Sequence, residues 1–324
     1  MYVLGIAGSP RKKGNTDYLL SLFLKQAGAA GYDTGLLEPN VNRYTPCIGC
    51  GYCEKHGVCS IDNSLETGVF PLLRQADIIV LASPVYFYGI PAWTKAMIDR
   101  SQTLWSRKYR FGLKDPGHDF RRGVLLCSGA THGKDLFDGI RLTARYFFDA
   151  VGAGFQDALY FRGMDRSGDL MARQGTQSEV AAFAERIFSP FGSRKKVMFL
   201  CRDGAVLGPM AHAFARSLAG DRLDAVWAGC ESGGSVNQAV VAAMAEKHLD
   251  LSFINSRPAE AAVGKQPPDL VVTLGCEASL PWLISPSSVE HWNVAQPADD
   301  SLEEIRRVRD DLEQKVRDMI SRVC

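Results

Sequence analysis

The sequence predicts an α/β protein with two doubly wound domains, each built on a parallel β-sheet covered by helices. Short, continuous apolar segments alternate with amphipathic helical segments along the chain, and this alternation is typical of strands buried on both faces of a parallel sheet. The length of 324 residues also favours about two domains. The alternation stops at a basic stretch containing Pro, Gly and Ser, and then begins again. We therefore expect a first domain over residues 1–188, a linker over 189–195 and a second domain over 196–324.

Four apolar segments are the expected strands of the first domain, and two segments between them have one apolar helical face each. The strands are Tyr2–Ala7, Asp77–Ala82, Gly123–Ser128 and Ala158–Phe161. The helical faces consist of Leu19, Leu20, Phe23, Leu24 and Ala27, and of Ile140, Ala144, Phe147, Phe148 and Val151. Thr16 or Asn15 is the expected N-cap of the first helix, and Asp17 is favourable in its first turn.

The second domain repeats the pattern of strand, loop and helix. Its expected strands are Val197–Leu200, Ala225–Ala228 and Leu270–Leu274. A helix follows the first of them, with Met210, Phe214 and Leu218 one turn apart. A charged helix from Ser301 to about Arg322 closes the chain, and its apolar stripe predicts that one side packs on the sheet.

Composition excludes several classes of function. The formal net charge is +1, so no global field favours nucleic acid or an anionic membrane. No segment approaches the apolar length of a membrane span, and no basic region precedes the first strand as in a signal peptide. Nine cysteines in a chain of this kind indicate metal or redox chemistry in a reducing cytoplasm rather than disulfides.

Four of these cysteines lie within thirteen residues, at Cys47, Cys50, Cys53 and Cys59. The spacing C-x2-C-x2-C-x5-C is typical of the ligands of a cubane iron–sulfur cluster, here 4Fe–4S. Zinc more often binds two separated C-x2-C pairs or a set that includes His. A zinc site, or a loop without metal, remains the alternative. His56 lies inside the segment and is interpreted as a solvated loop residue.

Three loops that suit a ligand follow three successive strands of the first domain. The turn Gly8–Thr16 contains small and hydroxyl residues that can surround a monophosphate at a helix N-terminus, and it lacks the ending of a nucleotide P-loop. The loop Ser83–Pro91 can provide an apolar wall for a planar isoalloxazine ring. The loop Ser128–Gly133 adds Ser128, Gly129 and His132. Because the carboxyl ends of parallel strands meet at one edge of a sheet, the three loops predict one FMN site.

These motifs, with Lys95 and the pair Asp99 and Arg100, resemble the NADPH-dependent FMN reductase family, and most closely its iron–sulfur flavoproteins. The resemblance covers about residues 1–188. It implies a flavodoxin-like fold, a 4Fe–4S cluster on the four cysteines, and assembly into dimers or tetramers. It places the FMN phosphate and ring on two sets of residues. The phosphate set is Ser9, Arg11, Asn15 and Thr16, and the ring set is Pro84, Val85, Tyr86, Phe87 and Tyr88.

In the second domain, Cys201 lies between a strand and a helix, in the loop Cys201–Pro209. Converging N–H groups and a helix dipole are expected to lower the pKa of a cysteine in that position. From Lys196 almost to the end, the chain resembles the low-molecular-weight tyrosine phosphatase fold, specifically its thiol-coupled arsenate reductase branch. The matching segments are Lys196–Cys201, Ala228–Gly229, Val236–Asn237, Met244–Glu246, Leu249–Ser252, Asp269–Cys276, His291–Trp292, Pro297–Ala298 and Val308–Asp310.

The catalytic residues of that family are incomplete here. Leu207 occupies the position of the oxyanion-binding Arg in the loop C-x5-R-S/T, and Gly208 replaces the hydroxyl residue. Gln296 precedes Pro297 where the family has its general-acid Asp, and an amide cannot replace a carboxylic acid in proton transfer. We therefore expect a degenerate domain without phosphatase activity.

The cysteines of the second domain are the remaining candidates for chemistry. Cys276 matches one additional thiol of the arsenate reductase branch, and Leu280 occupies the place of another. Cys201 and Cys276 are expected to lie near one another, as a dithiol or as a site for a soft ion such as trivalent arsenic. The alternative is that both are inert. Cys230, at the end of a strand, is interpreted as structural.

The sequence thus predicts an FMN-dependent oxidoreductase in which electrons pass between FMN and a 4Fe–4S cluster or a small acceptor. The electron donor is expected to be NAD(P)H or a ferredoxin-type protein. Two alternatives concern the second domain. In one, it is a non-catalytic thiol-based module that regulates the flavin domain. In the other, a Cys201–Cys276 disulfide is reduced internally by the flavin.

Overall fold

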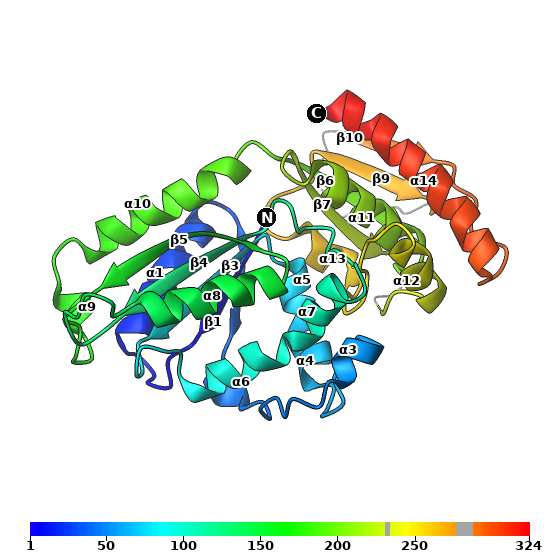
Figure 1. The fold of residues 1–324 in the computed structure, drawn as a ribbon. Helices are drawn as coiled ribbons and strands as arrows, with labels where there is room; N and C mark the ends of the chain where they lie inside the picture. The colour runs from blue at the N-terminus through cyan, green and yellow to red at the C-terminus, as the bar shows by residue number, and fades with distance from the viewer. Residues whose placement is uncertain (231–233, 277–287) are drawn as a thin grey trace. The chain divides into compact units, whose positions relative to one another are not determined.

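The chain is described by a computed structural model over residues 1–230, 234–276 and 288–324 (Figure 1). It divides into two compact units. The first unit comprises Met1–Phe111 and Phe120–Pro190, and the second comprises Gly112–Asp119 and Phe191–Cys324. Residues 112–119, which the sequence analysis included in the first domain, therefore group with the second unit. Among the described residues, no helix is both long and apolar enough to cross a membrane.

The sheet of the first unit has five parallel strands in the order β2-β1-β3-β4-β5. This is the strand order of flavodoxin-like folds, which confirms the predicted doubly wound architecture. The strands are β1 (Tyr2–Ala7), β2 (Asp33–Leu37), β3 (Ile78–Pro84), β4 (Arg122–Ser128) and β5 (Gly154–Phe161). The strand order reverses between β1 and β3, so the loops after these two strands begin at the position where such sheets bind ligands.

Helices cover both faces of this sheet. They are α1 (Asn15–Ala29), α2 (Pro39–Asn42), α3 (Tyr52–His56), α4 (Ser64–Gly68), α5 (Phe70–Gln75), α6 (Ala92–Arg100), α7 (Gln102–Tyr109), α8 (Asp138–Ala150), α9 (Asp169–Ala172) and α10 (Thr176–Phe188). A Cβ on Gly5 would meet Leu20 of α1, whereas a Cβ on Gly123 would meet Phe148 of α8. Strand register puts Gly5 on the face opposite to Gly123, so α1 and α8 lie on opposite faces.

The start of α1 differs from the prediction. The N-cap is Gly14, and no side chain caps the helix. Asn15 is the first helical residue and Thr16 is buried in the first turn, so the expected cap at Asn15 or Thr16 was wrong. The carboxylate of Asp17 accepts a hydrogen bond of 2.8 Å from the backbone N–H of Lys13, the residue before the N-cap.

The second unit contains another parallel sheet, in the order β10-β9-β6-β7-β8. Its strands are β6 (Lys195–Cys201), β7 (Leu223–Gly229), β8 (Arg257–Pro258), β9 (Leu270–Leu274) and β10 (Ser288–Trp292). Its helices are α11 (Leu207–Ala219), α12 (Gln238–Ala245), α13 (Ala259–Val263) and α14 (Leu302–Val323), and a 3-10 turn, Ser189–Phe191, precedes β6. The central strand β6 lies between β7 and β9, so its carboxyl end, at Cys201, is the topological switch point of this sheet.

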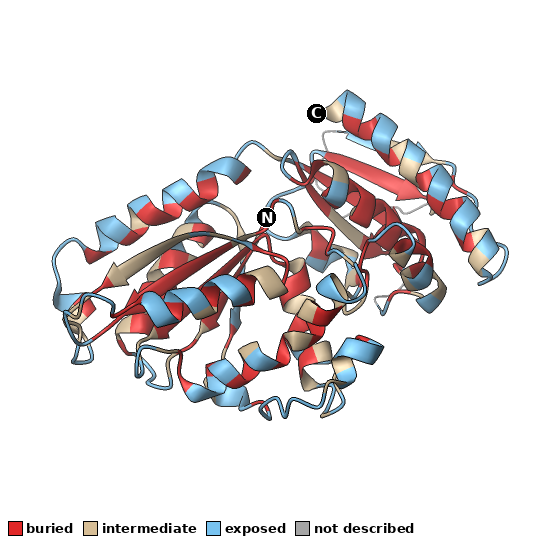
Figure 2. Ribbon diagram, in the orientation of Figure 1, coloured by how far each residue is buried: buried red, intermediate tan, exposed pale blue. Residues whose placement is uncertain are grey.

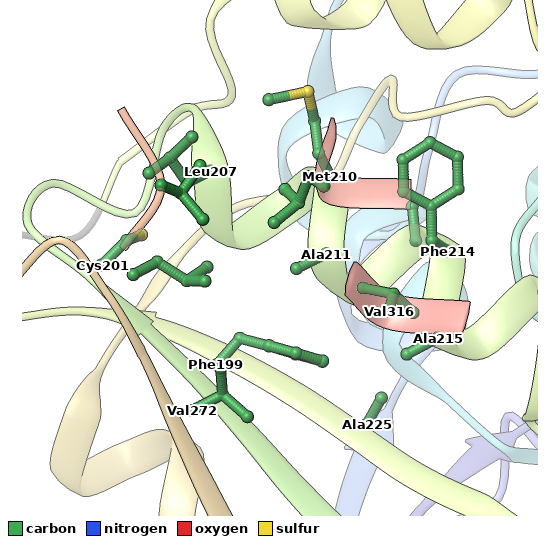
Figure 3. Packing of buried hydrophobic residues seen from close by; sticks show 14 of the residues in the cluster. Phe199, Cys201, Leu207, Met210, Ala211, Phe214, Ala215, Ala225, Val272 and Val316 are labelled. Atoms are coloured by element: carbon green, nitrogen blue, oxygen red, sulfur yellow. The ribbon is translucent and has the colours of Figure 1, made fainter. Parts of the chain in front are cut away.

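Each face of the second sheet has its own apolar cluster. Val197, Phe199 and Cys201 of β6 belong to the larger cluster with α11 and α14, part of which Figure 3 shows. Met198 and Leu200 belong to a smaller cluster on the other face, with Ala262 of α13. Alternate residues of β6 thus point to opposite faces, as the period of a strand requires. Figure 2 shows that the central strands are buried along their length.

The segment 112–119 joins the second unit by backbone pairing. The N–H of Lys114 donates to the carbonyl of His248 at 2.8 Å, and the N–H of Asp250 donates to the carbonyl of Lys114 at 2.8 Å. Lys114 thereby forms a parallel bridge with Leu249. The sequence gives no sign of this pairing, because a single bridge has no apolar periodicity.

Candidate functional site

The turn after β1 packs tightly against the end of β3. The N–H of Gly8 donates to the carbonyl of Ala82 at 2.7 Å. A Cβ on Gly8 would lie 2.7 Å from that carbonyl oxygen, so the close approach requires glycine. The hydroxyls of Thr16, in α1, and Ser128, at the end of β4, are both buried and lie 3.3 Å apart. The structure thus brings the predicted phosphate turn and the predicted third loop together.

Ser9 and Asn15, two other residues of the predicted phosphate set, form different kinds of hydrogen bond. Within the turn, the hydroxyl of Ser9 accepts from the N–H of Arg11 at 3.1 Å. The side chain of Asn15 instead bonds to protein: its amide donates to the carbonyl of Arg166 at 2.9 Å, and its oxygen accepts from the N–H of Leu170 at 3.2 Å. Asn15 therefore attaches the start of α1 to Arg166, before α9, and to Leu170, within α9. Sequence reasoning did not associate residues 166–170 with this edge.

The loop after β3 presents its aromatic residues on a strained turn. Tyr86 and Gly89 exchange backbone hydrogen bonds of 3.0 and 2.9 Å. Between them, Phe87 has φ 48° and Tyr88 has φ 61°. Two central residues with positive φ define a type I′ turn, for which Asn and Gly are the usual residues. Phe87 is fully exposed, and Tyr88 is about half exposed. Strain of this kind concentrates at functional sites.

The third loop is fixed to the segment after β5. The N–H of Gly129 donates to Phe161 at 2.9 Å, and its carbonyl accepts from Met164 at 3.0 Å. The exposed ring of His132 lies against Gly163, where a Cβ would come within 2.8 Å of Nε2. The N–H of Val85, next to Pro84, donates to the carbonyl of Ser128 at 3.2 Å. The second and third loops are therefore joined, as a shared ligand site requires.

A cavity of about 260 Å³ adjoins the turn after β1, but its charges do not suit a phosphate. It is lined by Ser9 and Lys12, and also by the carboxylates of Asp17 and Glu38. Lys12 forms an ion pair with Glu38, so its charge is already compensated. The charges around this cavity therefore disfavour a phosphate.

The four cysteines of the N-terminal motif line one cavity of about 430 Å³. Cys47 and Cys50 are exposed, and Cys53 and Cys59 are half-buried. The motif extends from the loop before α3, through α3, to the loop after it. His56 is exposed and stacks on Tyr52, with ring centroids 4.1 Å apart.

Three thiols of this cavity have hydrogen-bonding neighbours. The N–H of Gly49 donates to Cys47 Sγ at 3.5 Å, and the hydroxyl of Ser106 donates to Cys53 Sγ at 3.6 Å. Cys50 Sγ lies 3.2 Å from the hydroxyl of Ser60, which lowers the pKa of Cys50. The pKa of Cys53 is raised, first by burial. Donors around thiolates are one means by which proteins set the potential of an iron–sulfur cluster.

The spacing of the thiols bears on the kind of metal centre. Within the described ranges, no three or more His, Cys, Asp or Glu side chains lie close enough together to bind one metal ion. A cubane takes one thiolate on each of its irons, so its ligands surround a volume and do not converge on a point. Four thiols around a cavity fit that requirement.

Arg100, at the end of α6, fixes the loop that carries the last cysteine. Its side chain is fully buried, and it donates to both carboxylate oxygens of Asp62 at 3.1 Å and to the Asp62 carbonyl at 2.7 Å. From α7, Arg107 donates to the carbonyl of Gly57 at 3.1 Å. Asp99 and Arg100 are among the motifs of the family resemblance, which implies no role for either residue. Asp99 forms an ion pair of 2.6 Å with Lys95.

In the second unit, Cys201 is not the activated thiol that its position predicted. It is 1% exposed, and burial raises its pKa to about 12, while the N–H groups of Gly208 and Gly204 offset only part of this effect. Leu207, where the related family has Arg, is buried at the start of α11 (Figure 3). Arg202, on the same loop, is exposed. The expectation of a lowered pKa was wrong because desolvation outweighs the N–H groups.

Cys276 lies beside Cys230, which was interpreted from the sequence as a structural residue. Its Sγ is 3.3 Å from Sγ of Cys230, and both residues are half-buried. It also donates to the carbonyl of Leu200 at 3.5 Å. The thiol of Cys201 instead faces the carbonyl of Ala228 at 3.7 Å. Gln296 is exposed, and Leu280 lies outside the described residues.

Two family models match separate parts of the chain. Residues 1–134 match the family model of NADPH-dependent FMN reductase, and residues 196–324 match that of low molecular weight phosphotyrosine protein phosphatase. The chain therefore belongs to the NADPH-dependent FMN reductase family, a family of flavin oxidoreductases, through its first domain and to the low molecular weight phosphotyrosine protein phosphatase family through its second.

Individual relatives match one domain each. An iron–sulfur flavoprotein of Methanocaldococcus jannaschii is 38% identical over 104 residues, which are 32% of this chain and 53% of that protein. Arsenate reductase 2 of Staphylococcus saprophyticus is 33% identical over 126 residues, which are 38% of this chain and 95% of that protein. A solved arsenate reductase in a phosphate-binding state is 31% identical, with a TM-score of 0.36, and the match covers 40% of this chain and 99% of that one. The chain spans about half the length of the iron–sulfur flavoproteins it matches.

Proposed function

We propose that the first unit is an FMN-dependent oxidoreductase in which electrons pass between FMN and a 4Fe–4S cluster held by Cys47, Cys50, Cys53 and Cys59. The observation that carries the proposal is the cavity of about 430 Å³ lined by all four thiols, in the same unit as the three joined loops. Bound FMN would supply hydride and single-electron chemistry, and the cluster would supply single-electron transfer.

The residues of the chain have separate tasks in this proposal. The hydroxyls of Thr16 and Ser128 lie next to the N–H groups at the start of α1, where they can bind a phosphate. The aromatic residues of the turn Tyr86–Gly89 provide a planar, apolar surface for the isoalloxazine ring. Arg100 holds the cysteine loop in place. Four free thiols in one cavity require reducing surroundings, and we therefore place the protein in the cytoplasm.

The electron donor and the assembly are part of the proposal. The chain contains no G-x-G-x-x-G motif for a dinucleotide, so NAD(P)H would have to bind at the flavin itself, as flavodoxin-like reductases allow. A ferredoxin-type protein is the alternative donor. We also propose a homo-oligomer. An anaerobic titration with NADPH, NADH and a reduced ferredoxin, monitored by bleaching of the flavin absorbance, distinguishes the donors.

The experiment that tests the redox pair is an anaerobic purification followed by a visible spectrum and analysis of iron and sulfide. We expect flavin bands and about four irons per chain. In Cys50→Ser, iron and sulfide should be lost while flavin is retained. Cys127→Ser is the matched control, because Cys127 is a buried thiol of β4 outside the cavity. Flavin without iron in the wild-type protein would refute the cluster, and the absence of both would refute the whole proposal.

For the second unit, the geometry favours a non-catalytic module over a second enzyme. A buried Cys201 with a pKa of about 12 is a poor nucleophile at neutral pH, and Leu207 cannot bind an oxyanion. We propose that this unit regulates the flavin unit through ligand binding at its thiols. If Cys201→Ser changes ligand binding and leaves ligand-free flavin turnover unchanged, the regulatory proposal holds; if neither changes, the thiol is inert and the proposal fails; if turnover is abolished, the thiol takes part in electron flow instead.

A further inference from the structure

Two cysteines of the second unit meet in front of its central strand. Cys230 follows β7 directly, and Cys276 follows β9 after one glycine. Because β7 and β9 flank β6, chain segments from both sides of β6 bring these residues together at its carboxyl end. The N–H of Cys230 donates to the carbonyl of Cys201 at 2.8 Å, and Cys276 Sγ donates to that of Leu200 at 3.5 Å. Both cysteines are therefore attached to the end of the same strand.

Both thiols lie on one face of the sheet. Cys230 and Cys276 pack against the smaller apolar cluster, which contains Leu200 and Ala228. Cys201 belongs to the larger cluster on the other face, with Phe199 (Figure 3). Cys230 and Cys276 are half-buried, so reagents can reach them, whereas Cys201 is 1% exposed.

We propose that Cys230 and Cys276 are a redox modification site, at which a dithiol closes reversibly to a disulfide without the participation of Cys201. The separation of 3.3 Å between the two sulfur atoms is short enough that a small rotation of each side chain brings them to bonding distance. This inference does not depend on the proposed flavin chemistry. Cys276 is thus paired with Cys230, whereas the sequence predicted Cys201 as its partner.

The oxidant is a small-molecule disulfide, such as oxidised glutathione. The thiolate of one cysteine attacks the disulfide, a sulfur–sulfur bond breaks, and one small thiol leaves with a mixed disulfide on the protein. The second cysteine then attacks the protein sulfur of that mixed disulfide, and the second small thiol leaves. In sum, two protein thiols lose two electrons and two protons, and one small disulfide becomes two thiols. Excess reduced glutathione reverses both steps.

The test uses the full-length protein and tryptic peptides that separate the three cysteines. Cleavage after Lys and Arg puts Cys201 in residues 197–202, Cys230 in 223–247 and Cys276 in 266–306, one cysteine in each. The reduced protein is equilibrated anaerobically with defined ratios of reduced and oxidised glutathione, quenched with acid, alkylated and digested. Mass spectrometry then identifies linked and alkylated peptides.

We expect the linked peptide pair 223–247 and 266–306 to form as the oxidised fraction rises, with loss of alkylation at both cysteines and return of alkylation on reduction. The same link should form in Cys201→Ser. In Cys276→Ser, Cys230 should yield only a mixed disulfide with glutathione. Circular dichroism checks that both variants fold. A dominant link between 197–202 and 266–306, or full alkylation of all three peptides at every ratio, would overturn the proposal.

Discussion

Arg100 donates to both carboxylate oxygens and to the backbone carbonyl of Asp62, three residues after the last cysteine of the N-terminal motif. The Arg100 side chain is fully buried, while that of Asp62 is 38% exposed. A planar guanidinium with several donors can hold a loop in one conformation, whereas a lysine ammonium cannot reproduce the same set of bonds. The cysteine loop thus depends on a residue far from it in the sequence.

Arg100→Lys is therefore expected to weaken retention of the proposed cluster without abolishing flavin binding. The lysine keeps the positive charge but loses the forked contact with Asp62. We expect iron and sulfide content to fall several-fold after anaerobic purification, with the flavin content unchanged. The control is Arg110→Lys, because Arg110 contacts Glu54 of the same segment at 3.5 Å on the exposed surface, where ion pairs contribute little. Equal iron in Arg100→Lys and the control would contradict the role of Arg100.

The strained turn at Phe87 and Tyr88 leads to a second prediction, in which stability and binding change in opposite directions. Replacing both residues by Asn-Gly supplies the usual residues of a type I′ turn. Residues in unfavourable backbone regions cost about 1–3 kcal/mol each, so the flavin-free variant should unfold at higher denaturant concentration than wild type. FMN affinity, measured by quenching of flavin fluorescence, should fall because the aromatic surface is lost.

The matched control for this turn is Tyr146→Ser, which removes an exposed aromatic residue of α8. It should leave FMN affinity unchanged. If the Asn-Gly variant is stabilised and binds FMN as tightly as wild type, the turn does not contact the flavin. If it is not stabilised, the backbone at Phe87 and Tyr88 is not strained in solution.

A third prediction concerns phosphatase activity. The wild-type protein should hydrolyse p-nitrophenyl phosphate no faster than Cys201→Ser, since the oxyanion-binding Arg is replaced by Leu207. Leu207→Arg alone should not restore activity, because Cys201 remains buried with a pKa of about 12, and Gln296 cannot act as the acid. The measurement is the release of p-nitrophenol at neutral pH. A rate that depends on Cys201 in either protein would contradict the assignment of a degenerate site.

Much of the fold could be predicted because apolar runs identify central strands directly. The ranges Tyr2–Ala7 and Leu270–Leu274 are strands with the predicted bounds. The edge strands β2 and β10 were missed. In β2, Asp33, Thr34 and Gly35 give a polar strand that is only partly buried, and β10 is largely exposed. A strand at the edge of a sheet needs no continuous apolar run, so pattern alone does not reveal it.

The candidate site was predictable only in part, for a geometric reason. The four cysteines of the N-terminal motif are close in sequence, and a short loop brings them to one cavity. The pairing of Cys276 with Cys230 depends on which face of the sheet each thiol occupies, and a shift of one residue reverses that face. The raised pKa of Cys201 depends on how deeply α11 and its neighbours bury the loop. Neither the pairing of Cys276 with Cys230 nor the pKa of Cys201 follows from residue spacing.

The buried thiol of Cys201 also predicts how stability depends on pH. Its pKa in the folded protein is about 12, against an ordinary value of 9.0, so the folded state holds the proton more tightly than the unfolded chain. The resulting stabilisation is fully present below about pH 9 and is lost as the pH rises toward 12. Denaturation midpoints measured from pH 8 to pH 10.5 should therefore decline more steeply for wild type than for Cys201→Ser, whose hydroxyl does not titrate in this range. Parallel curves for the two proteins would mean that the thiol is exposed to water in solution.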